Sequence, residues 1–396
     1  MVVQPSPVVQ AATEDATVEV IRDVEPWQRL RPEWDELFQA SPTASPPLRF
    51  DWLWHWWRIY GPAYGNHGQG LRILTFRRQS RLIGVVPLYE MIKRSWGVPV
   101  RRLGFISTGE AEFEETCADY LDLLHLPGER EMCMEALVSA LCDRRTLAWD
   151  ELELFDMSGR SPLIDLHGRL RGCQTSLASS DTCPIANIAG GLEAFLERLS
   201  ANTRQQARRR LRMAQKAGAI LERAMDSSEV DPYFDDLIRL HQQRWNAIGQ
   251  PGVFASSRFT ELHRTLARSW VPTGKAILVR LSLDGQAMAV IYGFLVGTKF
   301  DFYQSGVAID EPSGLQSPGM VAFLMLKAHL AERGITQFDF LRGASPYKQR
   351  LATDYCPMIR LCAVRPGVRT RVFAISNFVR RLASKSRRVL RAATVV

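Results

Sequence analysis

The stretch AILVRLSLDGQAMAVIYGFLVGTKFDFYQS, residues 276–305, decides the fold class of this chain. Its three runs rich in aliphatic and aromatic residues are separated by two glycine-containing pairs, Asp284-Gly285 and Gly297-Thr298. Such two-residue turns join antiparallel strands, because glycine adopts their positive φ angles at little steric cost. The stretch therefore predicts a three-stranded meander. Its strands are expected at Ala276–Leu283, Ala287–Val296 and Lys299–Ser305.

Helices are expected on both sides of this meander. Two amphipathic patterns precede it, and Pro318 stands at the first-turn position of a following helix that Gly334 ends. The expected order is thus two helices, three strands, a helix and further strands. The helices are expected at 232–247, 257–270 and 319–333, and the strands at 336–341 and 358–364.

A strongly basic helix is expected upstream, at 203–217, with Asn202 as its N-cap. It carries six Lys or Arg and no acidic residue between Thr203 and Lys216. Such a run is either a solvated helix face or a binding surface for the phosphates of a carrier or an RNA acceptor stem. The neighbouring elements are expected to be a strand at 185–188, a helix at 192–200 and a strand at 220–225.

The first half of the chain also mixes helices with strands suited to an antiparallel meander. Its aromatic helix, from Phe50 to near Gly61, holds four tryptophans that indicate either core packing or a platform for stacking sugars. The other helices are expected at 27–39 and 129–142, and the strands at 17–23, 71–77, 81–91, 101–106, 120–124 and 151–155.

These two halves predict an α/β protein with mixed sheets, built by duplication of one domain type. The 396 residues exceed one comfortable hydrophobic core, which agrees with two domains. The expected division is a loose leader at 1–16, domains at 17–180 and 181–364, and a basic tail at 365–396.

The net charge of +8 belongs to the tail. Residues 365–396 hold nine Lys or Arg and no acid, so subtracting nine from +8 leaves −1 for the rest of the chain. A near-neutral body argues against nucleic acid as a general partner. If the tail is helical, Val372, Ile375, Val379, Leu382 and Val389 share a face ringed by arginines. That pattern predicts contact with an anionic membrane surface, with nucleic-acid attachment and a plain disordered tail as the alternatives.

Cysteine and histidine give no sign of a metal site. The seven cysteines are scattered without a C-x-x-C pair, and the histidines lack metal-binding spacings, so no metal or disulfide framework is expected. The longest uncharged apolar run, Leu82–Tyr89, is too short to span a membrane, and the start has no signal-peptide pattern. The expected location is the cytoplasm, with possible attachment to the inner face of the membrane.

Several motifs, taken together in order, carry a resemblance to a known family. In the second half they are His241-x-x-Arg244-Trp245 with Gly249 and Phe254, Tyr303-Gln304-Ser305-Gly306, Ser317-Pro318-Gly319, Phe338-Asp339-Phe340 with Gly343, and Tyr347-Lys348. In the first half they are Trp52–Trp57, Leu82–Leu88 and Asp119–Leu123. This order resembles the GNAT acyltransferases, in the cellulose-biosynthesis-protein-like branch related to the Fem-type peptidoglycan aminoacyl transferases.

The resemblance implies two tandem GNAT-like domains and transfer of an acyl group, with acyl-CoA as the donor, an amine or sugar hydroxyl of an envelope or exopolysaccharide precursor as the acceptor, and no metal. One stretch departs from the family: Leu315–Met320, in place of the glycine-rich phosphate loop, has one glycine and a proline without an N–H. An acyl carrier protein or an aminoacyl-tRNA therefore stays open as the donor. A non-catalytic scaffold of a polysaccharide-synthesis complex is the rival from another class.

The site residues follow from placing the reaction on the strand 299–305. Alternation puts Asp301, Tyr303 and Ser305 on one face, so Asp301 is the candidate general base and Tyr303 the candidate proton donor. Asp339 and Lys348 complete the catalytic candidates, although each of these side chains also fits a structural role. The expected donor-binding residues are Gln304, Ser305, Gln316, Ser317 and Gly319, and the expected acceptor-binding residues are His241, Arg244, Trp245 and Tyr347.

Overall fold

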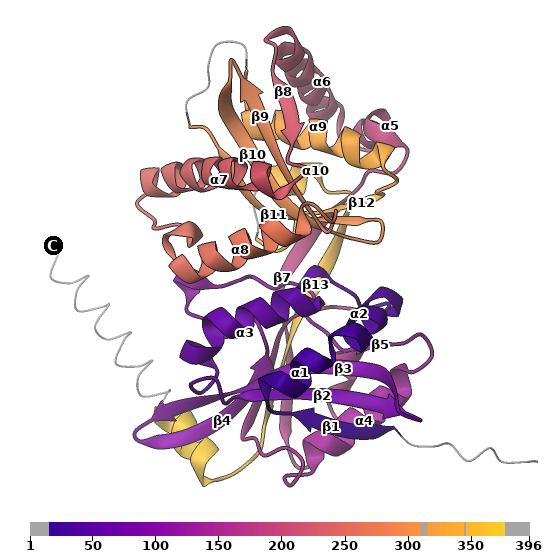
Figure 1. Cartoon of the computed structure of the whole chain (residues 1–396), viewed down its shortest axis with the longest axis vertical. Helices are drawn as coiled ribbons and strands as arrows, with labels where there is room; N and C mark the ends of the chain where they lie inside the picture. The colour runs from indigo at the N-terminus through magenta and orange to yellow at the C-terminus, as the bar shows by residue number, and fades with distance from the viewer. Residues whose placement is uncertain (1–15, 310–314, 344–345, 377–396) are drawn as a thin grey trace, which may run out of the picture.

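The computed structural model describes residues 16–309, 315–343 and 346–376, which form two lobes (Figure 1). Two long strands, β7 (Gln174–Asn187) and β13 (Asp354–Val364), run between the lobes and pair antiparallel along all of β13. The lobes therefore share a continuous sheet. The predicted mixed α/β class is confirmed.

The first lobe contains the expected antiparallel meander. Its strands pair in sequence order, and a further strand runs parallel beside the last of them. The meander strands are β1 (Thr17–Ile21), β2 (Leu71–Arg78), β3 (Arg81–Ser95) and β4 (Val98–Phe105); the parallel strand is β6 (Glu151–Ser158), and β5 (Leu124–His125) pairs with β3.

The helices of the first lobe bury their aromatic side chains. Trp52, Trp56 and Trp57 are buried and Trp54 is half-buried, so the tryptophans pack in the core and the sugar-platform interpretation is wrong. The helix expected at 27–39 is two helices, broken at Leu30. The helices are α1 (Val24–Arg29), α2 (Arg31–Ala40), α3 (Phe50–Tyr64) and α4 (Arg130–Cys142).

The second lobe contains the meander predicted from residues 276–305. The strands β9, β10 and β11 are antiparallel neighbours, and β12 lies parallel beside β11. Their bounds, with that of the edge strand β8, are β8 (Ile220–Arg223), β9 (Ala276–Leu283), β10 (Gln286–Val296), β11 (Lys299–Val307) and β12 (Gln337–Asp339).

Helices cover both faces of this second sheet (Figure 1). One face packs on α7 and α8 and continues into the core of the first lobe, whereas the other packs on α5, α6 and α9 in a separate core. The helices are α5 (Gly191–Glu197), α6 (Ala201–Lys216), α7 (Ser227–Ala247), α8 (Ser257–Trp270), α9 (Pro318–Glu332) and α10 (Pro346–Leu351).

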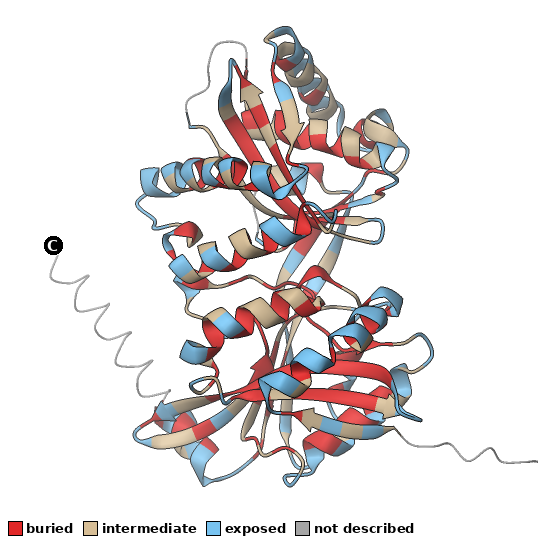
Figure 2. Ribbon diagram, in the orientation of Figure 1, coloured by how far each residue is buried: buried red, intermediate tan, exposed pale blue. Residues whose placement is uncertain are grey.

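Strand β13 joins the two lobes. The strand order is β1-β2-β3-β4-β6-β13-β7-β12-β11-β10-β9-β8, so β13 lies between a strand of the first lobe and β7. Buried residues fill the strands and the inner helix faces, and exposed residues lie on the outer faces (Figure 2).

Three local predictions are wrong. Residues 120–123 form no strand: Tyr120 has φ +66° and Ser45 donates a hydrogen bond to its carbonyl. The strand expected at 185–188 begins eleven residues earlier, at Gln174, because pairing with β13 orders a polar and largely exposed segment. The N-cap of α6 is Ser200, whose Oγ accepts from the N–H of Thr203, not Asn202.

Candidate active site

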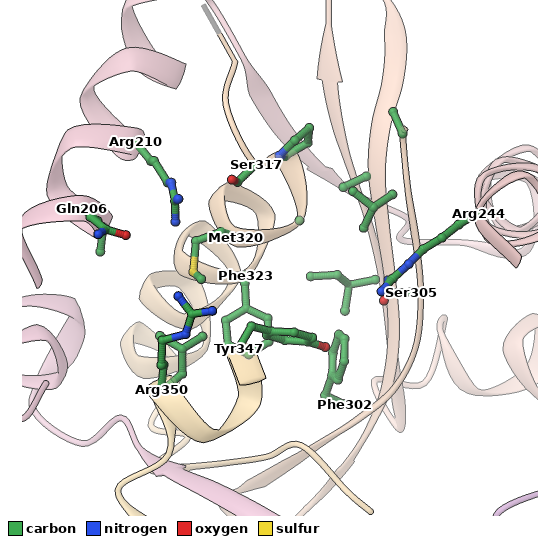
Figure 3. Close-up of a pocket in the computed structure, with 18 of the residues that line it drawn as sticks. Gln206, Arg210, Arg244, Phe302, Ser305, Ser317, Met320, Phe323, Tyr347 and Arg350 are labelled. Atoms are coloured by element: carbon green, nitrogen blue, oxygen red, sulfur yellow. The ribbon is translucent and has the colours of Figure 1, made fainter. Parts of the chain in front are cut away.

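A cavity of about 490 Å³ opens on the face of the second lobe that carries α6 and α9. Side chains from β10, β11, α6, α7, α10 and the first turns of α9 line it (Figure 3). The apolar part of the wall includes Ile291, Phe302, Met320 and Phe323. The cavity therefore has an apolar base enclosed by helices.

The cavity forms where the pairing between the parallel strands β11 and β12 ends. Strand β12 pairs with β11 only at Lys299, Phe300 and Asp301 and then ends at Asp339, whereas β11 continues to Val307. Beyond Asp301, the described residues give β11 a strand neighbour only on its β10 side. β11 thus has a free edge beyond Asp301, and α10 supplies Tyr347 and Arg350 to the cavity wall.

A β-bulge decides which side chains of β11 reach the cavity. Tyr292 pairs with Gln304 and Gly293 with Phe302, so Tyr303 is the extra residue. The bulge breaks the alternation, and Phe302, Ser305 and Val307 line the cavity together. The expectation that Ser305 shares a face with Asp301 and Tyr303 is therefore wrong.

Three arginines give the cavity a positive charge. Arg210 comes from α6, Arg244 from α7 and Arg350 from α10; Arg210 and Arg350 face the α9 side, and Arg244 reaches toward Ser305 (Figure 3). None of the described lining residues is acidic, and within the described ranges none of these arginines forms an ion pair. Three uncompensated guanidinium groups around one cavity favour an anionic ligand.

The first turn of α9 offers few free N–H groups. Pro318 has no N–H, and the N–H groups of Met320 and Val321 donate to the carbonyl of Ser317 at 2.9 and 3.2 Å. Gly319 allows close packing, because a Cβ there would lie 3.0 Å from Cγ2 of Val307. Positive charge at this cavity thus comes mainly from the arginines rather than from the helix terminus.

The structure brings five of the nine predicted binding residues to the cavity. Ser305, Ser317, Gly319, Arg244 and Tyr347 line it, and their role in binding stays a prediction.

The other four binding candidates lie elsewhere: Gln304, Gln316, His241 and Trp245 are not among the lining residues. Gln316 is exposed, as is Trp245. His241 is buried edge-on against Phe254, with ring centroids 4.9 Å apart, and burial lowers its pKa to about 4.

Asp301 and Asp339, two of the catalytic candidates, lie in a buried ionic network. Nζ of Lys299 lies 2.9 Å from Oδ1 of Asp301 and 3.5 Å from Oδ2 of Asp339. The hydroxyl of Tyr120 donates to Oδ2 of Asp339 at 2.7 Å. Burial raises the pKa of Asp301, against the attraction of Lys299. These contacts join the first lobe to the second.

Tyr303 also points away from the cavity. Its hydroxyl donates to the carbonyl of Thr116 at 2.5 Å and lies 2.9 Å from Nε2 of His263. Because Tyr303 donates its only hydroxyl proton to Thr116, its oxygen accepts a hydrogen bond from His263, which therefore carries its proton on Nε2. Burial lowers the pKa of His263 to about 3, so this imidazole is neutral.

Lys348 bonds within the second lobe, whereas Arg342 contacts the first. Nζ of Lys348 donates to the carbonyls of Phe340 and Arg342 at 2.8 and 2.9 Å. The guanidinium of Arg342 meets carboxylates of the first lobe: Glu115 at 2.7 Å, Asp119 at 3.0 Å and Asp156 at 2.8 Å.

None of the four catalytic candidates therefore lines the cavity. Tyr303 and Asp339 bond across the lobes to Thr116 and Tyr120. Asp301 and Lys348 bond to groups within the second lobe. In the described part of the chain, no group of three or more His, Cys, Asp or Glu is arranged to hold a metal ion.

Sequence reasoning did not assign Arg210, Arg350 or Phe302 to the site. Arg210 is one of six cations on its helix, and its inward direction follows only from the packing of α6 beside α9. The position of Arg350 depends on α10, a six-residue helix that was not among the expected elements. Phe302 was missed because the regular alternation assumed for β11 contains no β-bulge, and the bulge at Tyr303 places Phe302 on the same face as Ser305.

The fold resembles two solved structures in particular. The crystal structure of FemX matches with a TM-score of 0.61 and 12% identity, covering 90% of this chain and 99% of FemX. A conserved protein of unknown function from Bacteroides thetaiotaomicron VPI-5482 matches with a TM-score of 0.54 and 10% identity, covering 88% and 100% of the two chains. At such identities the likeness concerns the fold alone. No curated protein sequence matches the chain.

A family profile matches the part of the chain that builds the cavity. Residues 201–349 match the family described as "Acetyltransferase (GNAT) domain". They include every described lining residue except Arg350 and Leu351. The chain is thus a two-lobed α/β protein in which residues 201–349, in the second lobe, are similar to that acetyltransferase family.

Proposed function

We propose that the second lobe transfers an acyl group from an acyl-CoA donor held in the cavity. The observation that carries the proposal is the combination of three arginines, an apolar base and a free strand edge in one cavity of the GNAT-matched region. Each of these features matches one part of such a donor.

The donor phosphates fit the arginines. Guanidinium groups form paired, charge-assisted hydrogen bonds with phosphate oxygens, and Arg210 and Arg350 lie on the α9 side of the cavity. The pantetheine amides fit the free edge of β11, because an extended chain pairs with an open strand through its backbone groups. The acyl chain then lies against Phe302 and Phe323.

The reaction follows from this placement. The acceptor amine or hydroxyl attacks the thioester carbonyl, a new C–N or C–O bond forms, and the C–S bond breaks. The proton that the acceptor loses passes to the departing thiolate, directly or through a hydroxyl group of the cavity wall, so the products are the acylated acceptor and free CoA thiol. Among the described lining residues no carboxylate or imidazole is present, so hydroxyl groups are the exchangeable donors there, and Tyr347 is the one placed on α10. Orientation and charge stabilisation carry the catalysis.

The acceptor and pathway rest on the sequence resemblance. The cellulose-biosynthesis-protein-like motifs favour an acceptor from envelope or exopolysaccharide synthesis, with a small molecule or glycan precursor as the partner. The assignment to that branch stays a prediction.

A non-catalytic binding role is the second candidate. It is favoured by the position of all four expected catalytic side chains outside the cavity and by the scarcity of free N–H groups at α9. In that case the cavity binds a ligand without turnover.

Thermal unfolding with and without acetyl-CoA and longer acyl-CoAs tests the donor. A ligand that binds only the folded state stabilises it by about 2.7 kcal/mol at a hundred times its dissociation constant. We expect a dose-dependent rise in Tm with acyl-CoA. No rise with any acyl-CoA would exclude this donor and turn the search to acyl carrier proteins and aminoacyl-tRNA.

Turnover separates the two candidates. Release of free thiol from acetyl-CoA, measured with amine and sugar acceptors, should require an acceptor and fall at least tenfold in Tyr347→Phe while acetyl-CoA binding persists. Binding without thiol release across the acceptor set would favour the non-catalytic role.

A further inference from the structure

A short helix near the start of the basic tail, residues 368–376, packs against the first lobe. Residues 368–376 are helical, and Thr370, Phe373 and Ser376 form their buried face. Oγ of Ser376 donates to Oγ of Ser95 at 2.5 Å, at the end of β3. The guanidinium of Arg102, on β4, lies 6.0 Å from the ring centroid of Phe373. The helix 368–376 therefore lies beside the β3–β4 hairpin.

The hairpin and the helix expose apolar side chains at this place. Trp96 stands in the turn between β3 and β4, next to Ser95, and its side chain is 57% exposed. On the helix, Ile375 adjoins Ser376 and is 56% exposed, and Val368 is 79% exposed. Because Ser95 and Ser376 touch, Trp96 and Ile375 flank the same contact.

Cations surround these apolar residues. Arg94, Arg369 and Arg371 are exposed and form no ion pair with any described residue, whereas the nearby Glu151 and Glu153 are both bonded to Arg102. The sequence that follows, residues 377–396, adds six Lys or Arg and no acid. The patch and the tail together carry positive charge without nearby free carboxylates among the residues described.

We propose that this surface, Trp96 with the helix 368–376, binds the anionic face of a lipid bilayer. Tryptophan at a polar–apolar boundary is typical of membrane interfaces, and aliphatic residues among arginines suit insertion between headgroups. Each cation near an anionic bilayer strengthens binding about fivefold. Ile375 and Val368 offer nothing to a nucleic acid, which binds through phosphates and stacked bases, so charge and apolarity together favour lipid.

The proposal is independent of the acyltransferase activity. Figure 1 shows the hairpin and the helix at the end of the first lobe, opposite the end of the second lobe that carries α6. A bilayer bound there leaves the cavity facing water. The proposal concerns attachment only, since no helix in the described residues is long and apolar enough to cross a membrane.

Sedimentation of the full chain with vesicles tests the proposal. We expect binding to phosphatidylcholine vesicles that contain phosphatidylglycerol, at least tenfold weaker binding to phosphatidylcholine alone, and further weakening by salt. Trp96→Ser combined with Ile375→Ser should reduce binding at least tenfold at unchanged Tm, and Arg369→Gln with Arg371→Gln should do so to a similar extent.

Matched controls lie elsewhere on the surface. Phe113→Ser removes an equally exposed aromatic ring, and Arg209→Gln with Arg212→Gln removes two exposed cations of α6; neither should weaken vesicle binding. Equal binding to neutral vesicles, no binding to either kind, or loss in the controls would overturn the proposal. So would tighter binding to a DNA duplex that Trp96→Ser and Ile375→Ser leave unchanged.

Discussion

Lys327 is a buried amine without a carboxylate. Its Nζ lies 3.8 Å from the ring centroid of Phe195, 4.5 Å from that of Phe323 and 4.9 Å from that of Phe338, and has no hydrogen-bond partner among the described residues. Burial lowers the pKa of Lys327 well below its usual range. The rings attract a cation, but the loss of hydration outweighs that attraction.

Replacing this amine should stabilise the protein. Lys327→Met keeps the length of the side chain and removes the unsatisfied polar group, which costs about 1–3 kcal/mol in a protein interior. The unfolded chain binds a proton at Lys327 that the folded chain does not, so wild-type stability rises with pH up to the usual lysine range. Urea unfolding at several pH values should show a higher free energy of unfolding and a shallower pH slope in Lys327→Met. A loss of stability would show that the amine has a partner or a needed charge.

Asp122 gives the opposite pH dependence. It is 4% exposed, accepts from Oγ of Ser161 at 2.7 Å and from the N–H of Leu123 at 2.8 Å, and burial raises its pKa to about 7. Between about pH 4 and pH 7 the folded chain holds a proton at Asp122 that the unfolded chain has lost, so this group lowers stability as pH rises.

Asp122→Asn should remove that dependence. The amide oxygen keeps both accepted hydrogen bonds, and the variant should gain about 2–4 kcal/mol relative to wild type at pH 8 and little at pH 4. Chemical denaturation at the two pH values measures the difference. An equal effect at both values would mean that Asp122 is ionised throughout.

At the scale of elements, Gly306 sets the distance between β11 and α7. A Cβ at this position would lie 2.7 Å from Cβ of Leu240 and 2.8 Å from the carbonyl oxygen of Leu237. Gly306→Ala should therefore push α7 outward and cost about 1–3 kcal/mol. Gly285→Asn is the control, since nothing lies within 4 Å of that turn position and asparagine tolerates its positive φ. The unfolding free energies of the two variants give the comparison; equal small effects would contradict the close packing.

Elements with a strong local signal are those that the sequence predicted. The two glycine turns and the apolar runs placed β9, β10 and β11 within one or two residues, and α8 has its predicted bounds. Elements whose order comes from distant partners were missed or shortened: β7 is polar and largely exposed, and its strand conformation follows from pairing with β13.

The site shows the same division. Ser317, Pro318 and Gly319 line the cavity at the start of α9. The sequence predicted this helix start because the signal, a proline in the first turn, is local. The bulge at Tyr303 and the inward direction of Arg210 depend on packing between elements. The role assigned to Asp301 missed Lys299, two residues away on the same strand, as its partner.

At the scale of the molecule, Arg342 ties the second lobe to the first. Removing it leaves Asp119 and Asp156, both buried, without their cation, and breaking a buried pair in this way costs about 3–5 kcal/mol. Arg342→Met should therefore lower the urea midpoint strongly.

A double-mutant cycle with Asp119→Asn isolates the interaction. Asp119→Asn in the Arg342→Met background should recover part of the loss, because it removes one stranded charge. Additive losses in the two variants would contradict a direct pairing between the lobes.

Calorimetric titration of acetyl-CoA into the full chain tests the central claim, that the arginine-lined cavity binds a phosphate-bearing acyl donor. Wild type should bind, and binding should weaken with salt. Arg210→Gln with Arg244→Gln should weaken it at least tenfold, since a hydrogen bond to a charged group contributes about 1.5–3 kcal/mol. Arg209→Gln with Arg212→Gln, exposed cations on α6 outside the cavity, should leave it unchanged. No binding by wild type, or equal binding by the Arg210 and Arg244 variant, would contradict the account.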